Sequence, residues 1–282
     1  MLFNEYLLFF YIYFIGDTMN FRVGDYVTRS SHNNDIVFKI INIDNNIAYL
    51  NGVNVRLCAD ADISDLVIAN NVSINDDDVL EKTFKELNLN RNQYFYLPGS
   101  ILHIDGDENY LDRCMNFYKK MNVKANGIYL PEAEMSLKVK ELLEKFNPDI
   151  LVLTGHDALM NRKSSNNEYQ NSFNYVDAVK TARKYEKNQD KLIIIAGACQ
   201  SDYESLIKSG ANFASSPKRI NIHALDPAVI AVSLAFSDKN KSIDLLDLIN
   251  KTKYGSDGIG GIITNGTMYV GYPRWWLIRL KV

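Results

Sequence analysis

A histidine and a cysteine each follow an apolar run of the chain, and together they could act as a catalytic pair. His156 comes directly after "DILVLTG" (149–155), and Cys199 comes directly after "KLIIIAGA" (191–198). A thiol beside an imidazole and near a helix N-terminus ionises more readily and becomes a nucleophile. The segment "DYESL" (202–206) predicts such a helix just after the cysteine. These residues indicate acyl transfer by a Cys199–His156 dyad.

Small residues and free backbone groups beside this pair fit the same chemistry. Gly197 and Ala198 would let a substrate backbone approach the thiol. The N–H group of Cys199, together with one from the turn formed by Gly155, His156 and Asp157, could receive the developing oxyanion. We therefore expect an acyl-transfer site in which backbone groups stabilise the intermediate.

His223 offers an alternative partner for the cysteine. With Asp226 three residues on, it could form a Cys199–His223–Asp226 triad of the glutamine-amidotransferase kind. That arrangement requires a strand–turn–helix elbow with glycine two positions after the nucleophile, where this chain has Ser201. A cysteine amidase is thus a second enzyme hypothesis, and a non-catalytic scaffold is a third.

The other cysteines and histidines have structural interpretations. Cys58 falls in a predicted β-region and Cys114 inside an amphipathic helical pattern, so both are expected to be core residues. His32 is expected at a turn surface, and His103 is expected to pack inside a strand.

The elements that must position the pair appear from residue 99 onward. Short apolar runs at 100–105, 127–130, 149–153, 191–195 and 211–216 alternate with helical patterns. This alternation predicts an α/β fold, with a parallel sheet between helices in a Rossmann-like three-layer arrangement. Ligands of such sheets gather at the carboxyl ends of the strands, where His156 and Cys199 both lie. Near the C-terminus, Asn265-Gly266 between apolar runs predicts a hairpin.

The chain before this region divides into three further segments. Residues 19–68 contain short β-branched runs broken by turn residues, which predicts a small SH3-like all-β domain. Residues 69–97 are polar and are expected to be a linker, with Asp76–Asp78 at a helix N-terminus. Residues 1–18 are apolar but short for a membrane span, so we expect an upstream translation artefact, with a membrane anchor as the alternative. Residues 98–282 form the α/β domain.

Composition narrows the class of partner and cofactor. The net charge of −3, with both signs interspersed, provides no basic field for nucleic acid or a membrane surface. Three widely separated cysteines support neither a disulfide framework nor a zinc site, and they suggest a reducing compartment. We expect no metal and no cofactor.

Several longer stretches resemble a known family. "VGDYVTRSSHNNDIVFKI", "TGHDA", "YQNSFNYVDAVKTARKYE" and "AGACQSDYESLIKSGANFASSPKRINIHALDPAVIA" are similar to the YabG family of sporulation-specific proteases, over essentially everything from Met19 to Tyr272. The order of strand, His, strand and Cys also resembles the caspase, gingipain and clostripain clan, which implies a caspase-like layout. In one departure from the clan, Asp157 stands after His156 where caspases have glycine, which leaves the second oxyanion donor open.

The resemblance implies a cysteine endopeptidase of endospore-forming bacteria. Such an enzyme would be made in the mother-cell cytoplasm and act late in sporulation on spore coat and cortex-associated proteins. The resemblance implies Cys199 as nucleophile, His156 as general base, and cleavage after basic residues, especially Arg.

An Arg-specific pocket needs a carboxylate, because a guanidinium is best held by two oxygen atoms. Asp105 and Asp107, at the end of the first strand, are the candidates, and Asp157 is the alternative. Arg162 and Lys163 lie in an Asn/Ser-rich loop, where ordinary surface charge explains them and a self-cleavage site is the alternative.

Overall fold

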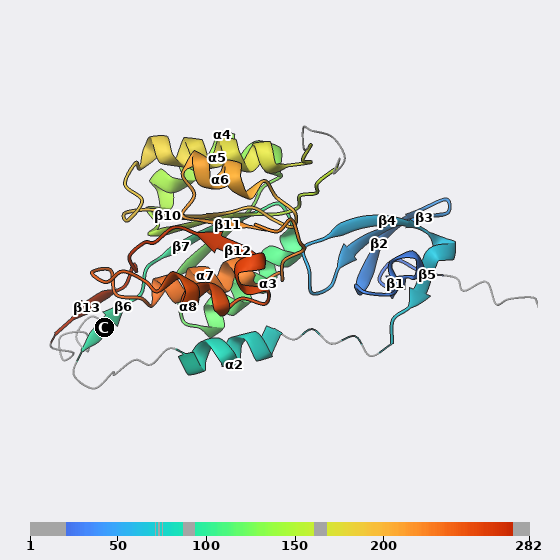
Figure 1. The fold of residues 1–282 in the computed structure, drawn as a ribbon, viewed down its shortest axis with the longest axis horizontal. Helices are drawn as coiled ribbons and strands as arrows, with labels where there is room; N and C mark the ends of the chain where they lie inside the picture. Colours follow the sequence, from blue (N-terminus) through green and yellow to red (C-terminus); the bar gives the residue numbers. More distant parts are fainter. Residues whose placement is uncertain are drawn as a thin grey trace, which may run out of the picture.

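A computed structural model describes residues 21–70, 72, 74, 76–86, 94–160 and 168–272 of the chain. The apolar segment 1–18 lies outside these residues, and so do Arg162 and Lys163. Within them the protein is a mixed α/β structure, with one antiparallel and one mostly parallel sheet (Figure 1).

The antiparallel sheet forms what we call the N-terminal β-unit (residues 26–68). Its strand order is β4-β3-β2-β1-β5, and its core contains Val27, Phe38, Ile40 and Leu50. The elements are β1 (Tyr26–Arg29), η1 (Ser30–His32), β2 (Phe38–Asp44), β3 (Ile47–Gly52), β4 (Cys58–Asp62), η2 (Ile63–Asp65) and β5 (Leu66–Ile68). The expected β-structure between residues 19 and 68 is present, and its likeness to an SH3 domain stays a prediction.

The second sheet has six strands in the order β12-β11-β10-β9-β7-β8. They are β7 (Ile101–Asp105), β8 (Ala125–Tyr129), β9 (Ile150–Thr154), β10 (Ile193–Ala196), β11 (Phe213–Ser215) and β12 (Ile259–Gly261). All neighbours are parallel except β11 and β12. The five apolar runs that predicted a parallel sheet correspond to β7 through β11.

Helices cover both faces of this sheet, as Figure 1 shows. They are α3 (Glu108–Lys120), α4 (Glu132–Phe146), α5 (Ser172–Tyr185), α6 (Tyr203–Ser209), α7 (Asp226–Ala235) and α8 (Leu245–Asn250). Side chains from α3, α7 and α8 pack in one core and those from α4, α5 and α6 in the other. Because β9 is apolar throughout, Ile150 and Val152 enter the first core while Leu151 and Leu153 enter the second.

The strand order places a topological switch point between β7 and β9. The chain passes from β7 to its neighbour β8 on one side and then to β9 on the other side. In open α/β sheets, the crevice outside the carboxyl ends of the strands at such a point is the usual place for a ligand. The residues following β7 and β9 are therefore the first ones to consider as a site.

Two connections differ from the sequence-based expectation. The segment 69–97 contains the helix α2 (Asp76–Glu86), with the predicted acidic first turn, and also β6 (Phe95–Leu97). β6 pairs with β13 (Tyr269–Gly271) in a separate two-stranded sheet. The hairpin predicted around Asn265-Gly266 is wrong, because β12 and β13 belong to different sheets and each finds a long-range partner. The short helix η3 (Gly255–Asp257) precedes β12.

No helix among the residues described is long and apolar enough to cross a membrane. The same residues contain no group of three or more His, Cys, Asp or Glu side chains arranged to hold a metal ion. All three cysteines are free thiols.

Candidate active site

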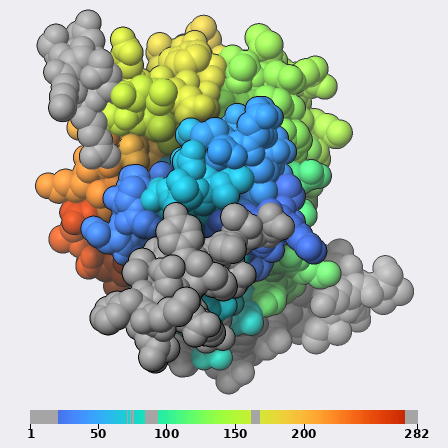
Figure 2. Space-filling model, turned by 90° about the vertical axis from the view of Figure 1, so that its right-hand side faces the viewer, coloured from blue at the N-terminus to red at the C-terminus, as the bar shows by residue number. Residues whose placement is uncertain are grey.

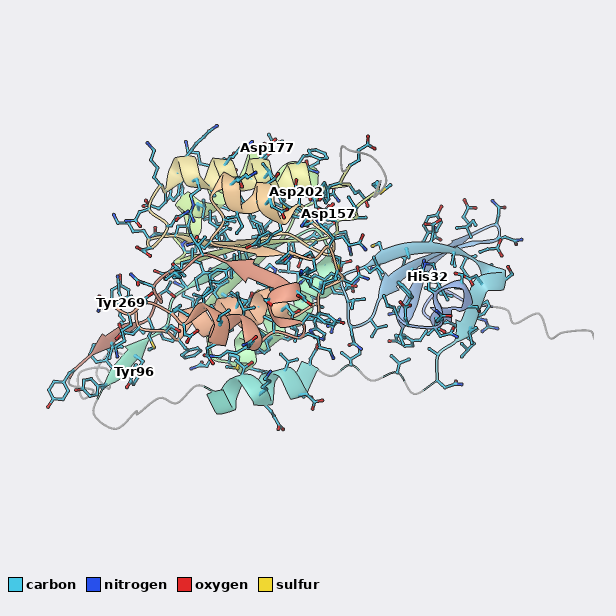
Figure 3. The ribbon with its side chains drawn as sticks, in the orientation of Figure 1. His32, Tyr96, Asp157, Asp177, Asp202 and Tyr269 are labelled. Carbon is cyan, nitrogen blue, oxygen red and sulfur yellow. The ribbon has the colours of Figure 1, made fainter. Side chains whose placement is uncertain are left out.

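The N-terminal β-unit lies against the carboxyl ends of the parallel strands. In the view of Figure 2 it stands in front of the rest of the chain. Figure 3 labels Asp157 and Asp202, which follow β9 and β10, and both lie at the end of the sheet nearest the β-unit. Any site at these strand ends is thus bordered by both parts of the chain.

His156 and Cys199 leave neighbouring strands, as the sequence predicted. β9 and β10 are paired in parallel, with Leu153 opposite Ala196. His156 therefore follows the end of one strand and Cys199 the end of the next, at the same edge of the sheet. The predicted helix after the cysteine is α6, which begins with Asp202 as its N-cap.

The thiol of Cys199 is completely buried, with 0% of the residue exposed. The N–H group of Ile222 donates to its Sγ atom at 3.3 Å. Burial raises the pKa of the Cys199 thiol to about 12, although the N–H group of Ile222 and the nearby Arg56 oppose the shift. The expected uncovered, easily ionised thiol is therefore wrong for this conformation, because neighbouring backbone encloses the sulfur.

The imidazole of His156 is held between a carboxylate and a thiol. Its Nε2 atom lies 2.9 Å from Oδ2 of Asp107, and its Nδ1 atom lies 3.4 Å from Sγ of Cys58. The ring of Tyr110 packs edge-on against it. Burial disfavours the charged imidazole, but the hydrogen bonds to Asp107 and Cys58 outweigh burial and raise the pKa of His156 to about 10. The imidazole is therefore protonated at neutral pH in this conformation.

Among the described residues no hydrogen bond joins Cys199 to His156, and Cys58 occupies the histidine instead. Cys58 begins β4, is exposed, and also lies 3.0 Å from Oδ1 of Asn51. The expectation that Cys58 is a core residue is wrong. The other expected core cysteine, Cys114, is buried in α3 as predicted.

Asp107 orients the histidine and begins a helix at the same time. As the N-cap of α3, it accepts the N–H group of Tyr110 at its Oδ1 atom, while Oδ2 faces His156. Burial opposes ionisation, but these hydrogen bonds hold the pKa of Asp107 below its ordinary value. Sequence reasoning placed Asp107 at this edge but did not connect it to the imidazole.

Asp105 binds an arginine of the same chain. Its Oδ2 atom lies 2.6 Å from NH1 of Arg56 and accepts the hydroxyl of Thr154 at 2.8 Å. His103 joins the network through its Nε2 atom, which is 2.7 Å from Oγ1 of Thr154. Burial would raise the pKa of Asp105, but Arg56 and His103 outweigh it and hold that pKa far below its ordinary value.

Arg56 is the residue of this site that sequence reasoning missed. It is wholly buried, although it comes from the N-terminal β-unit, between Val55 and Leu57. Burial opposes its charge, but the neighbouring Asp105 raises the pKa of Arg56 above the ordinary arginine value. The only signal in the sequence is a lone charge between apolar residues at the tip of a predicted hairpin.

Asp157 has a structural role in this arrangement. Its carboxylate accepts the N–H groups of Ala158 and Asn171 and the hydroxyl groups of Ser172 and Ser201. It therefore joins the turns that follow β9 and β10. Burial raises the pKa of Asp157, while these hydrogen bonds oppose the shift.

The backbone groups expected to bind an oxyanion divide into two sets. The N–H groups of Gly197 and Ala198 donate within their own turn and strand end, to Leu153 and to the hydroxyl of Ser201. Gly155 leaves no room for a Cβ atom, because Oε1 of Glu132 would lie 2.5 Å from it. By contrast, the N–H groups of Cys199 and Asp157 donate to no group in the described part of the chain.

His223 and Asp226 are near this edge but do not form a triad in this conformation. Asp226 accepts the backbone N–H of His223, and the Nδ1 atom of His223 accepts the N–H of Leu225. Burial lowers the pKa of His223 to about 4 and raises that of Asp226 to about 6. Within the described residues, the imidazole of His223 makes no hydrogen bond to Cys199.

Comparison with known proteins agrees with the resemblance found in the sequence. The profile of the family described as "YabG peptidase U57" matches residues 22–273. The chain is 41% identical over 286 residues to "Sporulation-specific protease YabG" of Bacillus subtilis (strain 168). That alignment covers 90% of this chain and 99% of the relative.

Proposed function

This chain belongs to the YabG peptidase U57 family and is a protease, and on that premise we propose that it is a cysteine endopeptidase. Cys199 is the nucleophile and His156 the general base, with Asp107 orienting the imidazole. The single observation that carries the proposal is the His156–Asp107 pair, held at 2.9 Å at the strand end adjacent to that of Cys199.

The geometry supports a division of roles between the two ring nitrogens. Asp107 holds Nε2, so Nδ1 is the atom available to exchange a proton with a thiol. Once Cys58 leaves, Nδ1 can turn toward Cys199 on the adjacent strand end. The unused N–H groups of Cys199 and Asp157 are the proposed oxyanion donors. Asp157 is thus a proposed donor through its backbone, while its carboxylate fixes the turn.

Cleavage after Arg or Lys is supported by Asp105. A buried carboxylate that already holds a guanidinium at 2.6 Å is what a pocket for a basic side chain requires. Asp105 is therefore our proposed specificity residue. Asp107 and Asp157 serve the histidine and the turns instead.

The biological setting is proposed from the family. The Bacillus subtilis relative is named a sporulation-specific protease. We extend this to the present chain as an enzyme made in the mother cell of a sporulating bacterium. Its proposed substrates are spore coat and cortex-associated proteins, and a caspase-like layout of its α/β part belongs to the same proposal.

Cys58 is the competing nucleophile, because its thiol is the one that faces His156, at 3.4 Å. Hydrolysis of an Arg-containing reporter peptide and of a candidate coat protein should be compared among Cys199→Ala, Cys58→Ala, His156→Ala and His223→Ala. We expect Cys199→Ala and His156→Ala to be inactive, and the other two to retain substantial activity.

The remaining outcomes identify the alternatives. Loss of activity in Cys58→Ala, with Cys199→Ala active, would transfer the nucleophile to the β-unit. Loss in His223→Ala, with His156→Ala active, would favour the amidase triad. Undiminished cleavage in both cysteine variants would exclude cysteine catalysis. If no variant and no wild-type protein cleaves either substrate, the scaffold hypothesis gains support.

A further inference from the structure

The tip of the β3–β4 hairpin lies in the site in the manner of a bound peptide strand. We call residues 53–57 the hairpin tip. The N–H group of Arg56 donates to the carbonyl of Ile222, and the N–H group of Ala224 donates to the carbonyl of Asn54. Val55 and His223 face each other as an antiparallel bridge. Pairing of an extended segment with a protein strand is a common mode of peptide recognition.

The side chain of Arg56 fills a pocket at the switch point between β7 and β9. NH1 binds Asp105, Nε donates to the carbonyl of Ala224 at 3.0 Å, and NH2 lies 3.3 Å from Sγ of Cys114. The guanidinium also stacks over the ring of Tyr110, with its centre 5.0 Å from the ring centroid. Charge, hydrogen bonds and an aromatic face together make this a site for a basic side chain.

The strand that pairs with Arg56 also touches the proposed nucleophile. Ile222 uses its carbonyl for the N–H group of Arg56 and its own N–H for Sγ of Cys199. The backbone of Arg56 is close enough to Cys199 to act on its thiol. The chain turns directly after Arg56, since the N–H group of Leu57 donates to the carbonyl of Val55. Cys58 follows and meets His156. The residues on either side of the Arg56–Leu57 bond therefore face the two proposed catalytic side chains.

An arginine that only fastens the β-unit to the α/β part could lie anywhere along their contact. This one lies at the switch point, in strand register, with the proposed nucleophile on one side and the proposed base on the other. We propose that the hairpin tip is bound as an internal substrate and that the protein cleaves its own Arg56–Leu57 bond. The inference rests on the proposed cysteine endopeptidase function.

The reaction requires only groups of this chain and water. Departure of Cys58 from Nδ1 removes a hydrogen bond that favours the charged imidazole, and neutral His156 then accepts the thiol proton of Cys199. Sγ bonds to the carbonyl carbon of Arg56, the C–N bond to Leu57 breaks, and His156 gives the proton to the new Leu57 amine. Water then hydrolyses the thioester, which leaves the Arg56 carboxylate and restores the thiol.

Self-cleavage is tested with the full chain under denaturing mass spectrometry and N-terminal sequencing. Wild-type protein, Cys199→Ala, Arg56→Gln and the matched control Arg22→Gln are incubated after purification. Arg22 is exposed and belongs to the same part of the chain. We expect a fragment that begins at Leu57 in the wild type and in Arg22→Gln, and none in the other two variants. Because the reaction is intramolecular, its half-time should not change over a hundredfold range of protein concentration.

A second readout keeps the test decisive if Arg56→Gln folds poorly. Every protein is also assayed on an Arg reporter peptide at about 0.1 mM. A tethered tip acts at an effective concentration on the order of 1 mM, so Arg56→Gln should hydrolyse the peptide about tenfold faster than Arg22→Gln. In the wild type, the Leu57 N-terminus alone decides the question.

The outcomes separate the two proposals. Reporter hydrolysis that needs Cys199, together with an intact Arg56–Leu57 bond in active wild-type protein, would overturn self-cleavage and leave the proposed function standing. A fragment that begins at Leu57 in Cys199→Ala would overturn cleavage by this site. Equal reporter hydrolysis by wild type and Cys199→Ala would overturn the proposed function itself.

Discussion

Replacing Asp105 by Asn should release the hairpin tip from the α/β part, and the contacts allow the size of this effect to be worked out. The variant is made in the Cys199→Ala chain, so that no self-cleavage interferes. Arg56 and Asp105 are both wholly buried and 2.6 Å apart. Removing one partner of a buried ion pair costs about 3 to 5 kcal/mol, because the other charge stays in a medium that solvates it poorly.

The protein can avoid this cost by moving Arg56 into water. The penalty then appears as a change in the ratio of docked to undocked tip, rather than as global unfolding. At about 1.4 kcal/mol for each factor of ten, 3 to 5 kcal/mol corresponds to an increase in the undocked population of between about 100-fold and several thousand-fold.

Limited trypsin digestion measures that population, because trypsin cleaves after arginine and can reach Arg56 only when the tip is undocked. When reclosing is faster than cleavage, the rate follows the open population. Asp60→Asn is the matched control, since Asp60 is an exposed carboxylate on β4. We expect cleavage after Arg56 at least 100 times faster in Asp105→Asn than in Asp60→Asn, with unchanged far-UV circular dichroism.

Two results would refute this reasoning. Rates within threefold of each other in the two folded variants would mean that the Arg56–Asp105 pair does not hold the tip. Loss of the whole fold in Asp105→Asn would mean that the pair supports the sheet rather than the docking.

Three further predictions concern the surroundings of the site. Thr154→Val removes the hydroxyl that links His103 to Asp105 and should lower the free energy of unfolding by about 1 to 3 kcal/mol in urea titrations; an unchanged midpoint would contradict it. The pKa of His156 is about 10 in the folded protein, above its ordinary value of 6.5, so its contribution to stability is complete below pH 6.5 and is lost as the pH rises through 10. Urea titrations of the Cys199→Ala chain should therefore show stability falling between pH 6.5 and 9, with a flatter profile after His156→Gln. Asp157→Ala leaves four donors of two turns without their acceptor and should lower the thermal midpoint more than Asp60→Asn does.

The parallel sheet could be predicted because its strands are apolar at almost every position. Strands such as β9 and β10 are buried on both faces, so their sequences are continuous aliphatic runs, and strand ends can be read directly. The pattern of apolar runs is therefore enough to put Asp105, His156 and Cys199 at one edge of the sheet. The helices that follow these strands are equally visible from their caps and apolar spacing.

The enclosed state of the site could not be predicted in the same way. Arg56 and Cys58 reach it only because a hairpin from the N-terminal β-unit docks there, and docking between distant segments leaves no periodic signal. The same holds for β6 and β13, whose pairing spans most of the chain. Asn265-Gly266 misled because each flanking run found a partner elsewhere, and tertiary pairing overrode local turn preference.

The strand pairing around the hairpin tip bears on the timing of events after a cut. β4 pairs with β3 from Asn51–Cys58 to Ile47–Asp62, and β5 pairs with β1. The piece ending at Arg56 would carry β1, β2 and β3, while the other piece would keep β4 and β5. Two ladders would therefore hold the spent segment in place, with its arginine still facing Asp105. Breaking the bond and vacating the pocket are then separate events, and the delay between them is set by how fast a small β-sheet comes apart.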